Sequence, residues 1–256
     1  MECKDVEWAA FLFNAIGEDE EYIKYLKIIQ GKIQIGQKFG SDIVKFLNKW
    51  KSRINLDIKD TIDTWYKENH ETLNWFSFSL IDANLDDETI ADRIKYIYRS
   101  LVGKKVKCIG NTSASKTLHM LNPDLFVPWD RPIKAWYDFQ LNHRDYKKIE
   151  AAAKYLVFLK KMQKAAKSLL QQNSNFLSEL NSNVKKLYEG NLEQAKNSEP
   201  QLKGEPKKSM KIKIDNYTKM VDFMKNTGKT ITKYLDEYNW ITITNAVKIK
   251  PQWHPD

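Results

Sequence analysis

Apolar residues recur every three or four positions along most of this chain, which is the spacing of one face of an α-helix. In the first hundred residues this pattern predicts helices over residues 7–16, 18–30, 41–50, 57–65, 71–81 and 86–101. The last of these places Ile90, Ile94, Ile97 and Leu101 on one stripe. The connector 31–40 contains three glycines, but it matches neither a dinucleotide fingerprint nor a phosphate loop, so we interpret it as turns.

The helical pattern continues in the second half of the chain and then changes. Residues 144–188 predict a long helical region with a break at the polar tract 171–175. Residues 191–209 contain two prolines and no apolar periodicity, which predicts a linker. After it, alternation over 211–214 predicts a short strand, 217–225 and 230–238 predict helices, and 240–244 with 247–250 predict a hairpin.

These elements predict a mostly α-helical protein in two parts. A multi-helix domain covers residues 1–190, the linker covers 191–209, and a small C-terminal α/β module covers 210–256. In the module, the order helix, turn, helix, hairpin resembles a winged helix in topology. An unrelated capping subdomain fits the same order, so both interpretations stay open.

Charge is distributed unevenly along the chain. Residues 1–100 carry a net charge of −4, residues 101–200 carry +8, and residues 201–256 carry +5. This asymmetry is typical of a basic surface that faces a polyanion such as DNA, with an acidic part turned away from it. The alternative is a lysine-rich surface that serves solubility or heat stability.

The stretch 109–137 combines features that occur together nowhere else in the chain. Gly110 supplies a turn, and the N-capping residues Asn111, Thr112 and Ser113 begin a helix that contains Lys116. After a five-residue apolar run, Asp130 caps a second helix that has Pro132 at its second position. Turn chemistry, a potential nucleophile and a potential acid/base group therefore lie within thirty residues.

This stretch resembles the helix-hairpin-helix DNA glycosylase superfamily. Lys116-Thr117-Leu118 stands where the family usually has Lys-Thr-Ala at the start of the hairpin's second helix. Pro128-Trp129-Asp130 stands where the family has an apolar residue, valine and a catalytic aspartate. The resemblance implies an all-helical scaffold that grips DNA phosphates with the hairpin and acts on a base flipped out of the duplex.

The resemblance also implies a set of site residues. Lys116 would attack the sugar C1′ as a neutral amine, and Asp130 would stabilise the cationic sugar that develops as the base departs. The expected phosphate contacts are Lys104, Lys105, Lys107, Gly110, Asn111, Thr112, Ser113 and Ser115, and the expected walls of the base pocket are His119, Trp129 and Trp136.

Each of these residues also has a purely structural interpretation. Asp130 is a good helix cap, Lys116 is compatible with a surface position, the two tryptophans are compatible with core positions, and His119 with a hydrogen-bonded core histidine. Two alternatives to an enzyme also stay open. One is a non-catalytic DNA-binding protein on the same scaffold, and the other is an interaction protein whose basic face meets an acidic partner.

Composition narrows the class of protein further. A hydrophobic fraction of 42% with 29% charged residues is typical of a globular chain. Two cysteines, Cys3 and Cys108, are too few for a disulfide framework or a four-thiolate iron–sulfur cluster. Neither a transmembrane segment nor a secretory signal is evident. We therefore expect a cytoplasmic monomer that acts on duplex DNA without a metal or other cofactor and without a membrane.

Overall fold

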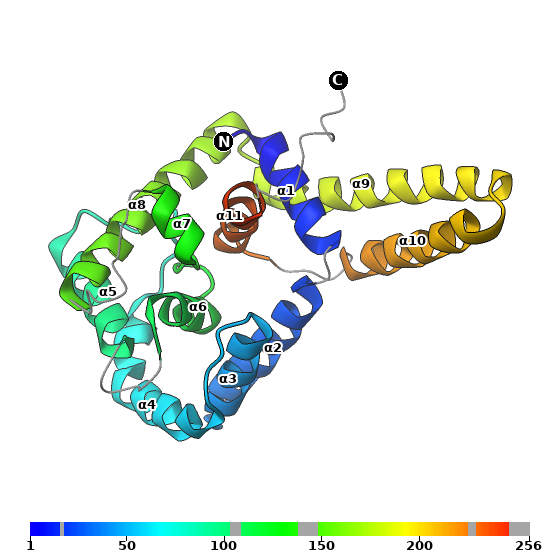
Figure 1. Cartoon of the computed structure of the whole chain (residues 1–256). Coiled ribbons are helices and arrows are strands. Elements are labelled where there is room, and N and C mark those ends of the chain that lie inside the picture. The colour runs from blue at the N-terminus through cyan, green and yellow to red at the C-terminus, as the bar shows by residue number, and fades with distance from the viewer. Residues whose placement is uncertain (16–17, 103–108, 138–147, 225–228, 246–256) are drawn as a thin grey trace.

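The computed structural model describes residues 1–15, 18–102, 109–137, 148–224 and 229–245. Within these residues the chain forms helices and no β-strand, which confirms the mostly α-helical prediction (Figure 1). The α-helices are α1 (Cys3–Ala15), α2 (Glu18–Gln34), α3 (Gly40–Lys49), α4 (Lys59–Trp75), α5 (Glu88–Leu101), α6 (Asn111–Leu121), α7 (Arg131–Trp136), α8 (Lys148–Gln172), α9 (Phe176–Ser198), α10 (Gly204–Phe223) and α11 (Ile231–Asn239).

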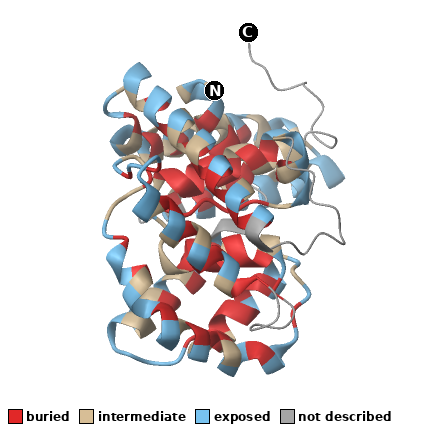
Figure 2. Cartoon of the chain, turned by 90° about the vertical axis from the view of Figure 1, so that its left-hand side faces the viewer, coloured by how far each residue is buried: buried red, intermediate tan, exposed pale blue. Residues whose placement is uncertain are grey.

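A main hydrophobic core joins the helices of the body, and α6 contributes fully buried residues to it. Ala114, Leu118 and Met120 of α6 are fully buried, and so are Leu125, Phe126 and Val127 of the segment that follows. The apolar run between α6 and α7 is therefore the buried crossing that its composition predicts. Figure 2 shows the buried residues on the inward faces of the helices. No helix among the described residues combines the length and the apolar character that a membrane crossing needs.

The start of α3 illustrates how the N-terminal helices are fixed against each other. A Cβ atom on Gly40 would lie 2.0 Å from the carbonyl oxygen of Lys59, so only glycine allows α3 to approach the start of α4 this closely. The cap comes from α4, because the Asp63 carboxylate accepts hydrogen bonds from the backbone N–H groups of Phe39 and Gly40, at 3.0 and 2.8 Å. Ser41, the first residue of the helix that the sequence predicts, lies inside α3 instead of at its start.

The prediction of a C-terminal α/β module is wrong for the residues that the structure describes. Residues 211–214 belong to α10, so the predicted strand is a helix. Trp240–Thr244 forms a π-helical turn that continues α11, and the second predicted hairpin strand, 247–250, lies outside the described residues. A four-residue alternation of lysine and isoleucine is too short to distinguish a strand from a helix, and here the surrounding helix decides.

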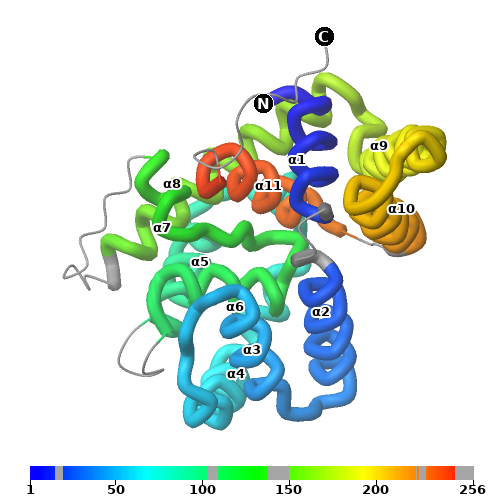
Figure 3. The backbone as a smooth tube through the Cα atoms, turned by 45° about the vertical axis from the view of Figure 1, so that its right-hand side comes forward, coloured from blue at the N-terminus to red at the C-terminus, as the bar shows by residue number. Residues whose placement is uncertain are grey.

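Residues 191–209, expected as a linker, are largely helical as well. Helices α9 and α10 pack against each other and project from the body as an antiparallel arm (Figures 1 and 3). The two prolines do not interrupt these helices, because Pro200 opens the 3-10 turn Glu199–Gln201 and Pro206 lies in the first turn of α10. The segment lacks apolar periodicity because these parts of α9 and α10 are mostly exposed to water.

Helix α11 packs in the body of the protein instead of on a separate module. It contacts α1 and α8, and its residues Ile231, Tyr234 and Leu235 belong to the main hydrophobic core. Every residue from Ile231 to Glu237 is buried. Charged and apolar positions of this helix are therefore enclosed together, and this determines the electrostatics of the cavity beside it.

Candidate active site

A small cavity lies where α1, α3, α6, α7 and α11 meet. The volume of this cavity is about 60 Å³. Its walls combine aromatic, apolar and charged side chains. These residues are Phe13, Trp50, Lys51, Lys116, Pro128, Trp129, Asp130, Ile133, Asp236 and Trp240. Lys116 and Asp130, separated by 14 residues in the sequence, thus open onto the same space.

Lys116 reaches the cavity from α6 and lies at the end of α3. Its Nζ donates a hydrogen bond of 3.0 Å to the Trp50 carbonyl oxygen, and it lies 5.1 Å from the centre of the Trp50 ring. Trp50 ends α3, and the following Lys51 adopts a left-handed conformation with φ 61°. This turn leaves the last carbonyl of the helix free to accept the lysine amine, at the end of the helix dipole that favours a cation.

Asp130 both caps α7 and lines the cavity. Its Oδ1 accepts a hydrogen bond of 3.0 Å from the Ile133 backbone N–H, and its Oδ2 accepts one of 2.9 Å from the Thr244 hydroxyl. These bonds fix the carboxylate between α7 and the π-helical turn after α11. Since each carboxylate oxygen has two lone pairs, both keep acceptor capacity toward the cavity. Capping and a role in the cavity are therefore compatible.

Asp236 is a second carboxyl group in the cavity, and no local pattern in the sequence points to it. It is only 6% exposed, and its Oδ2 lies 3.1 Å from Nζ of Lys233 one turn earlier in α11. Burial raises the pKa of the Asp236 carboxyl group, and the amines of Lys233 and Lys116 oppose this rise. The carboxylate of Asp130, which borders the same cavity, adds to the rise in the pKa of Asp236.

Lys233 is fully buried and is held by aromatic rings from three helices. Its Nζ lies 4.1 Å from the ring centre of Phe13, 4.8 Å from that of Tyr22 and 4.9 Å from that of Trp50. Such rings attract an ammonium group, most strongly where water is excluded. Trp50 is therefore close to two lysine amines, that of Lys116 and that of Lys233.

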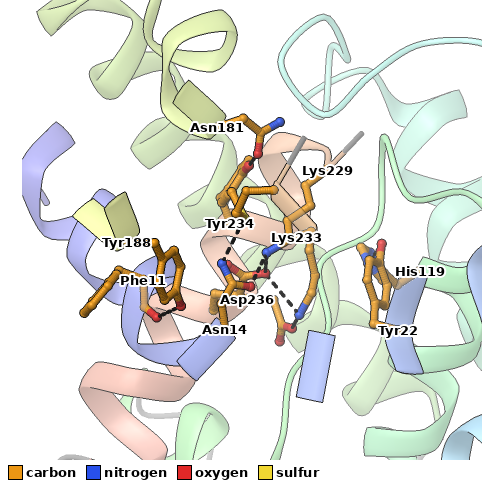
Figure 4. A network of polar contacts seen from close by, with 12 residues as sticks. Phe11, Asn14, Tyr22, His119, Asn181, Tyr188, Lys229, Lys233, Tyr234 and Asp236 are labelled. Atoms are coloured by element: carbon orange, nitrogen blue, oxygen red, sulfur yellow. Dashed lines mark hydrogen bonds and ion pairs between the residues drawn. The ribbon is translucent and has the colours of Figure 1, made fainter. Parts of the chain in front are cut away.

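The charges of α11 continue away from the cavity as a buried network (Figure 4). Glu237 lies 3.5 Å from Lys233 and 3.0 Å from Lys229, both measured between Nζ and Oε1. Lys229 also donates a hydrogen bond of 2.8 Å to the Asn14 side chain of α1. We call Lys229, Lys233, Asp236 and Glu237 the α11 charge cluster. It contains two cations and two carboxyl groups, so its charges balance when all four are ionised.

The predicted phosphate-contacting residues fall into three groups. Gly110, Asn111 and Thr112 form the accessible start of α6, where no side chain caps the backbone N–H groups. Ser113 and Ser115 are buried. Ser115 accepts a hydrogen bond of 3.1 Å from the Trp129 backbone N–H, which assigns it to packing and leaves it inaccessible to phosphate. Lys104, Lys105 and Lys107 lie outside the described residues.

Lys134 of α7 places a further amine beside the start of α6, and it is not among the residues predicted from the sequence. Its Nζ donates a hydrogen bond of 3.3 Å to the Thr112 hydroxyl and lies 5.6 Å from the centre of the Trp129 ring. Burial lowers the pKa of Lys134 to about 8, against the opposing effect of Asp130. A half-buried amine beside free backbone N–H groups makes this end of α6 attractive to an anion.

The three predicted pocket walls have different locations. Trp129 lines the cavity, as expected. His119 does not, because it is fully buried between Tyr22 and the crossing segment. Its Nδ1 lies 2.7 Å from the Phe126 carbonyl oxygen, and its Nε2 lies 2.8 Å from the Tyr22 hydroxyl. Burial lowers the pKa of His119 to about 3, so the ring is neutral, donates from Nδ1 and accepts at Nε2.

Trp136, the third predicted wall, lies outside the cavity. It is 68% exposed and borders a shallow groove with a volume of about 510 Å³, which we call the Trp136 groove. Tyr137, Tyr238, Lys161 and Lys164 also border this groove, and none of the lining residues is acidic. Exposed rings with nearby lysines are typical of surfaces that contact nucleic acid strands.

The described residues contain no cluster of histidine, cysteine or acidic side chains arranged to hold a metal ion. The chain matches no protein family model, no curated protein sequence and no solved structure.

Proposed function

We propose that this protein is a DNA glycosylase that excises a damaged or mispaired base, with the cavity between α6, α7 and α11 as its active site. One observation carries the proposal. Lys116 and Asp130, the two residues that the resemblance to helix-hairpin-helix glycosylases selects, line the same aromatic cavity. An amine and a carboxylate around one cavity are the two groups that displacement of a base from C1′ requires.

In this proposal Lys116 attacks the sugar and Asp130 stabilises the positive charge that develops on it. The amine must be neutral to attack, although a free lysine has a pKa of about 10.4. Burial and nearby cations favour the neutral form, whereas nearby carboxylates favour the charged form. Lys116 is half-buried and the Lys233 amine lies near the same Trp50 ring, while Asp130 and Asp236 border the same cavity, where a carboxylate can take up the lysine proton. Asp130 is held rigidly by its two hydrogen bonds, so little reorganisation is needed as charge develops.

The aromatic walls are suited to a flipped base. Phe13, Trp50, Trp129 and Trp240 all border the cavity. Its free space holds about four water-sized groups at roughly 15 Å³ each, which is less than a whole base needs. Base entry therefore requires these side chains to move outward, and we expect DNA with a lesion to change the tryptophan fluorescence of the protein.

A second candidate function is DNA binding without catalysis. The observation that favours it is the position of the Lys116 amine, which donates to the last carbonyl of α3, where the helix dipole stabilises the charged form. A permanently charged Lys116 would be a structural residue or a phosphate contact and could not act as a nucleophile. The two functions differ in whether any base is released and whether a covalent adduct forms.

The test compares the unmodified protein with Lys116→Gln and Asp130→Asn on duplexes that carry a panel of damaged and mispaired bases. Asparagine is also a good helix cap, so Asp130→Asn removes the charge and keeps the hydrogen bond to Ile133. We expect each variant to lower the rate of base release by about 10²–10³-fold. Borohydride should trap a protein–DNA adduct with the unmodified protein and not with Lys116→Gln.

The exposed positions Lys45 and Asp60 provide matched controls, since Lys45→Gln and Asp60→Asn make the same chemical changes away from the cavity. Both controls should retain full activity. If the unmodified protein releases no base from any duplex and forms no adduct, the glycosylase proposal is wrong. Salt-dependent DNA binding that is unchanged in Lys116→Gln and Asp130→Asn would then support the non-catalytic function.

A further inference from the structure

Asp236 borders the cavity but has no role in the reaction proposed for Lys116 and Asp130. Its carboxyl group is 6% exposed and borders the cavity, on the wall that α11 contributes. Lys116 enters the same cavity from α6, and Asp130 enters it from the start of α7. The cavity thus brings together two carboxyl groups and an amine from three separate segments of the chain.

The two oxygens of Asp236 have different surroundings. Lys233 holds Oδ2 at 3.1 Å, whereas Oδ1 accepts no hydrogen bond from the residues that the structure describes. Lys233 is itself fixed by the rings of Phe13, Tyr22 and Trp50 and by Glu237. Asp236 therefore combines a rigid anchor on one oxygen with a second oxygen that is available to a molecule in the cavity.

The charged groups around Asp236 distinguish it from Asp130. From its own helix it faces Lys233, with Glu237 and Lys229 behind it. From the opposite walls it faces Lys116 and Asp130, with Lys51 also on the cavity. Burial favours the neutral acid, and Asp130 adds to this effect. The ionised form is not prohibited, however, because the buried Lys233 amine lies beside it. A group that is stable in both forms is suited to proton transfer.

We propose that Asp236 is the acid that gives a proton to the departing base and that Lys233 stabilises the carboxylate left behind. This inference rests on the proposed glycosylase function and deepens it. The Asp236 carboxyl group donates its proton to a ring nitrogen of the base. The C1′–N bond breaks, and its electron pair leaves with the base, which departs neutral. The Lys116 lone pair forms the new bond to C1′, and the Asp236 carboxylate then takes a proton from the nitrogen of this adduct.

The proposal makes a prediction about the chemical class of the base. Neutral purines and other poor leaving groups need the proton, so their release depends on Asp236. A 7-methylguanine base already carries a positive charge and leaves as a neutral molecule, so its release does not need an acid. Removal of Asp236 should therefore discriminate between the two kinds of substrate, which general damage to the active site would not do.

The experiment measures single-turnover release of 7-methylguanine and of neutral purine lesions by the unmodified protein, Asp236→Asn and Asp236→Glu. We expect Asp236→Asn to slow release of neutral purines by about 10²–10⁴-fold and to leave 7-methylguanine release within a few fold. Asp236→Glu, which keeps an acid, should restore part of the lost rate. An equal loss for both kinds of base, or no loss for either, would overturn the proposal.

The unmodified protein gives a second test that does not depend on how a variant folds. An acid must be protonated to act, so release of a neutral purine should fall as the pH rises through the pKa of Asp236. Release of 7-methylguanine should show no such fall. If the unmodified protein shows the falling limb for neither substrate, Asp236 is not the acid. If it releases no base at all, the proposed glycosylase function fails and this inference fails with it.

Discussion

Helices α10 and α11 carry similar numbers of charged residues for their length, but their charges lie in opposite environments. On α10, Lys208 and Glu205 form an ion pair of 2.8 Å in which both side chains are more than 70% exposed. On α11, Lys233 and Asp236 form one of 3.1 Å in which neither side chain exceeds 8% exposure. The distances are alike, and the difference between the two pairs is the access of water.

This comparison shows that a charge pattern in the sequence does not determine its role. An exposed ion pair contributes little to the free energy of unfolding, because water and salt screen the attraction between its charges. A buried pair costs several kcal/mol per ion in desolvation and persists only where the surroundings compensate for that cost. For Lys233 the compensation comes from rings on α1, α2 and α3, and a hydrophobic helix would avoid the cost altogether. We therefore interpret the α11 charge cluster as a set of charges that determines the electrostatics of the cavity and does not stabilise the fold.

The largest effect should follow from breaking the cluster at its centre. Lys233→Met removes the cation and leaves Asp236 and Glu237 close together in the interior. Removal of one partner from a buried ion pair typically costs about 3–5 kcal/mol. We expect Lys233→Met to lower the free energy of unfolding by about this amount, measured by urea denaturation. Lys213→Met makes the same change at an exposed position of α10 and should have no measurable effect. Equal effects at both positions would contradict the comparison.

A second effect concerns pH and His119, which shares Tyr22 with the cluster. Its pKa is about 3 in the folded protein and about 6.5 in the unfolded chain, so the unfolded state binds more protons below pH 6.5. Folding stability should therefore fall as the pH drops from about 6.5 toward 3, by up to a few kcal/mol. In His119→Gln this part of the acid-induced loss should disappear.

His119→Gln should also be less stable than the unmodified protein at neutral pH, by about 1–3 kcal/mol, because buried hydrogen-bond partners are disturbed. The matched control is His70→Gln, since His70 is exposed on α4. It should leave the pH dependence of the unfolding midpoint unchanged. A His119→Gln curve that is parallel to that of the unmodified protein would show that another group causes the acid sensitivity.

Much of the fold follows from local patterns in the sequence. The stripe Ile94, Ile97 and Leu101 is fully buried on α5, as its spacing predicts, and the apolar run before Asp130 crosses the core. The errors lie where the local pattern is weak. The alternation at 211–214 is compatible with either a strand or a helix. The polar segment 191–209 has no apolar periodicity because its helical residues are mostly exposed, although α9 and α10 pack against each other.

The sequence predicts only the part of the candidate site that depends on local patterns. Lys116 and Asp130 are near in sequence, so turn and cap patterns place them on neighbouring elements. Asp236 lies more than a hundred residues further along. The spacing of Lys233, Asp236 and Glu237 on one helix is the ordinary pattern of an exposed face. Only the packing of α11 against α1 and the aromatic residues of α1–α3 makes this face an interior one, and no local signal encodes that contact.

The smallest effect should come from shortening the arm. Residues 196–209 form the end of α9, the turn after it and the start of α10, and nearly all of them are exposed or half-exposed. The contacts that join the arm to the body, including the ring pair of Phe11 on α1 and Tyr188 on α9 at 4.5 Å, lie outside this segment.

We therefore expect replacement of residues 196–209 by a short turn of glycine and asparagine to change the melting temperature by only a few degrees. Base release and lesion binding should be unaltered, because no residue of the segment borders the cavity or the Trp136 groove. Calorimetry and the base-release assay check both expectations. If the replacement lowers the melting temperature as much as Lys233→Met does, the arm supports the core. In that case the exposed charges of the arm would matter for stability as much as the buried charges of α11.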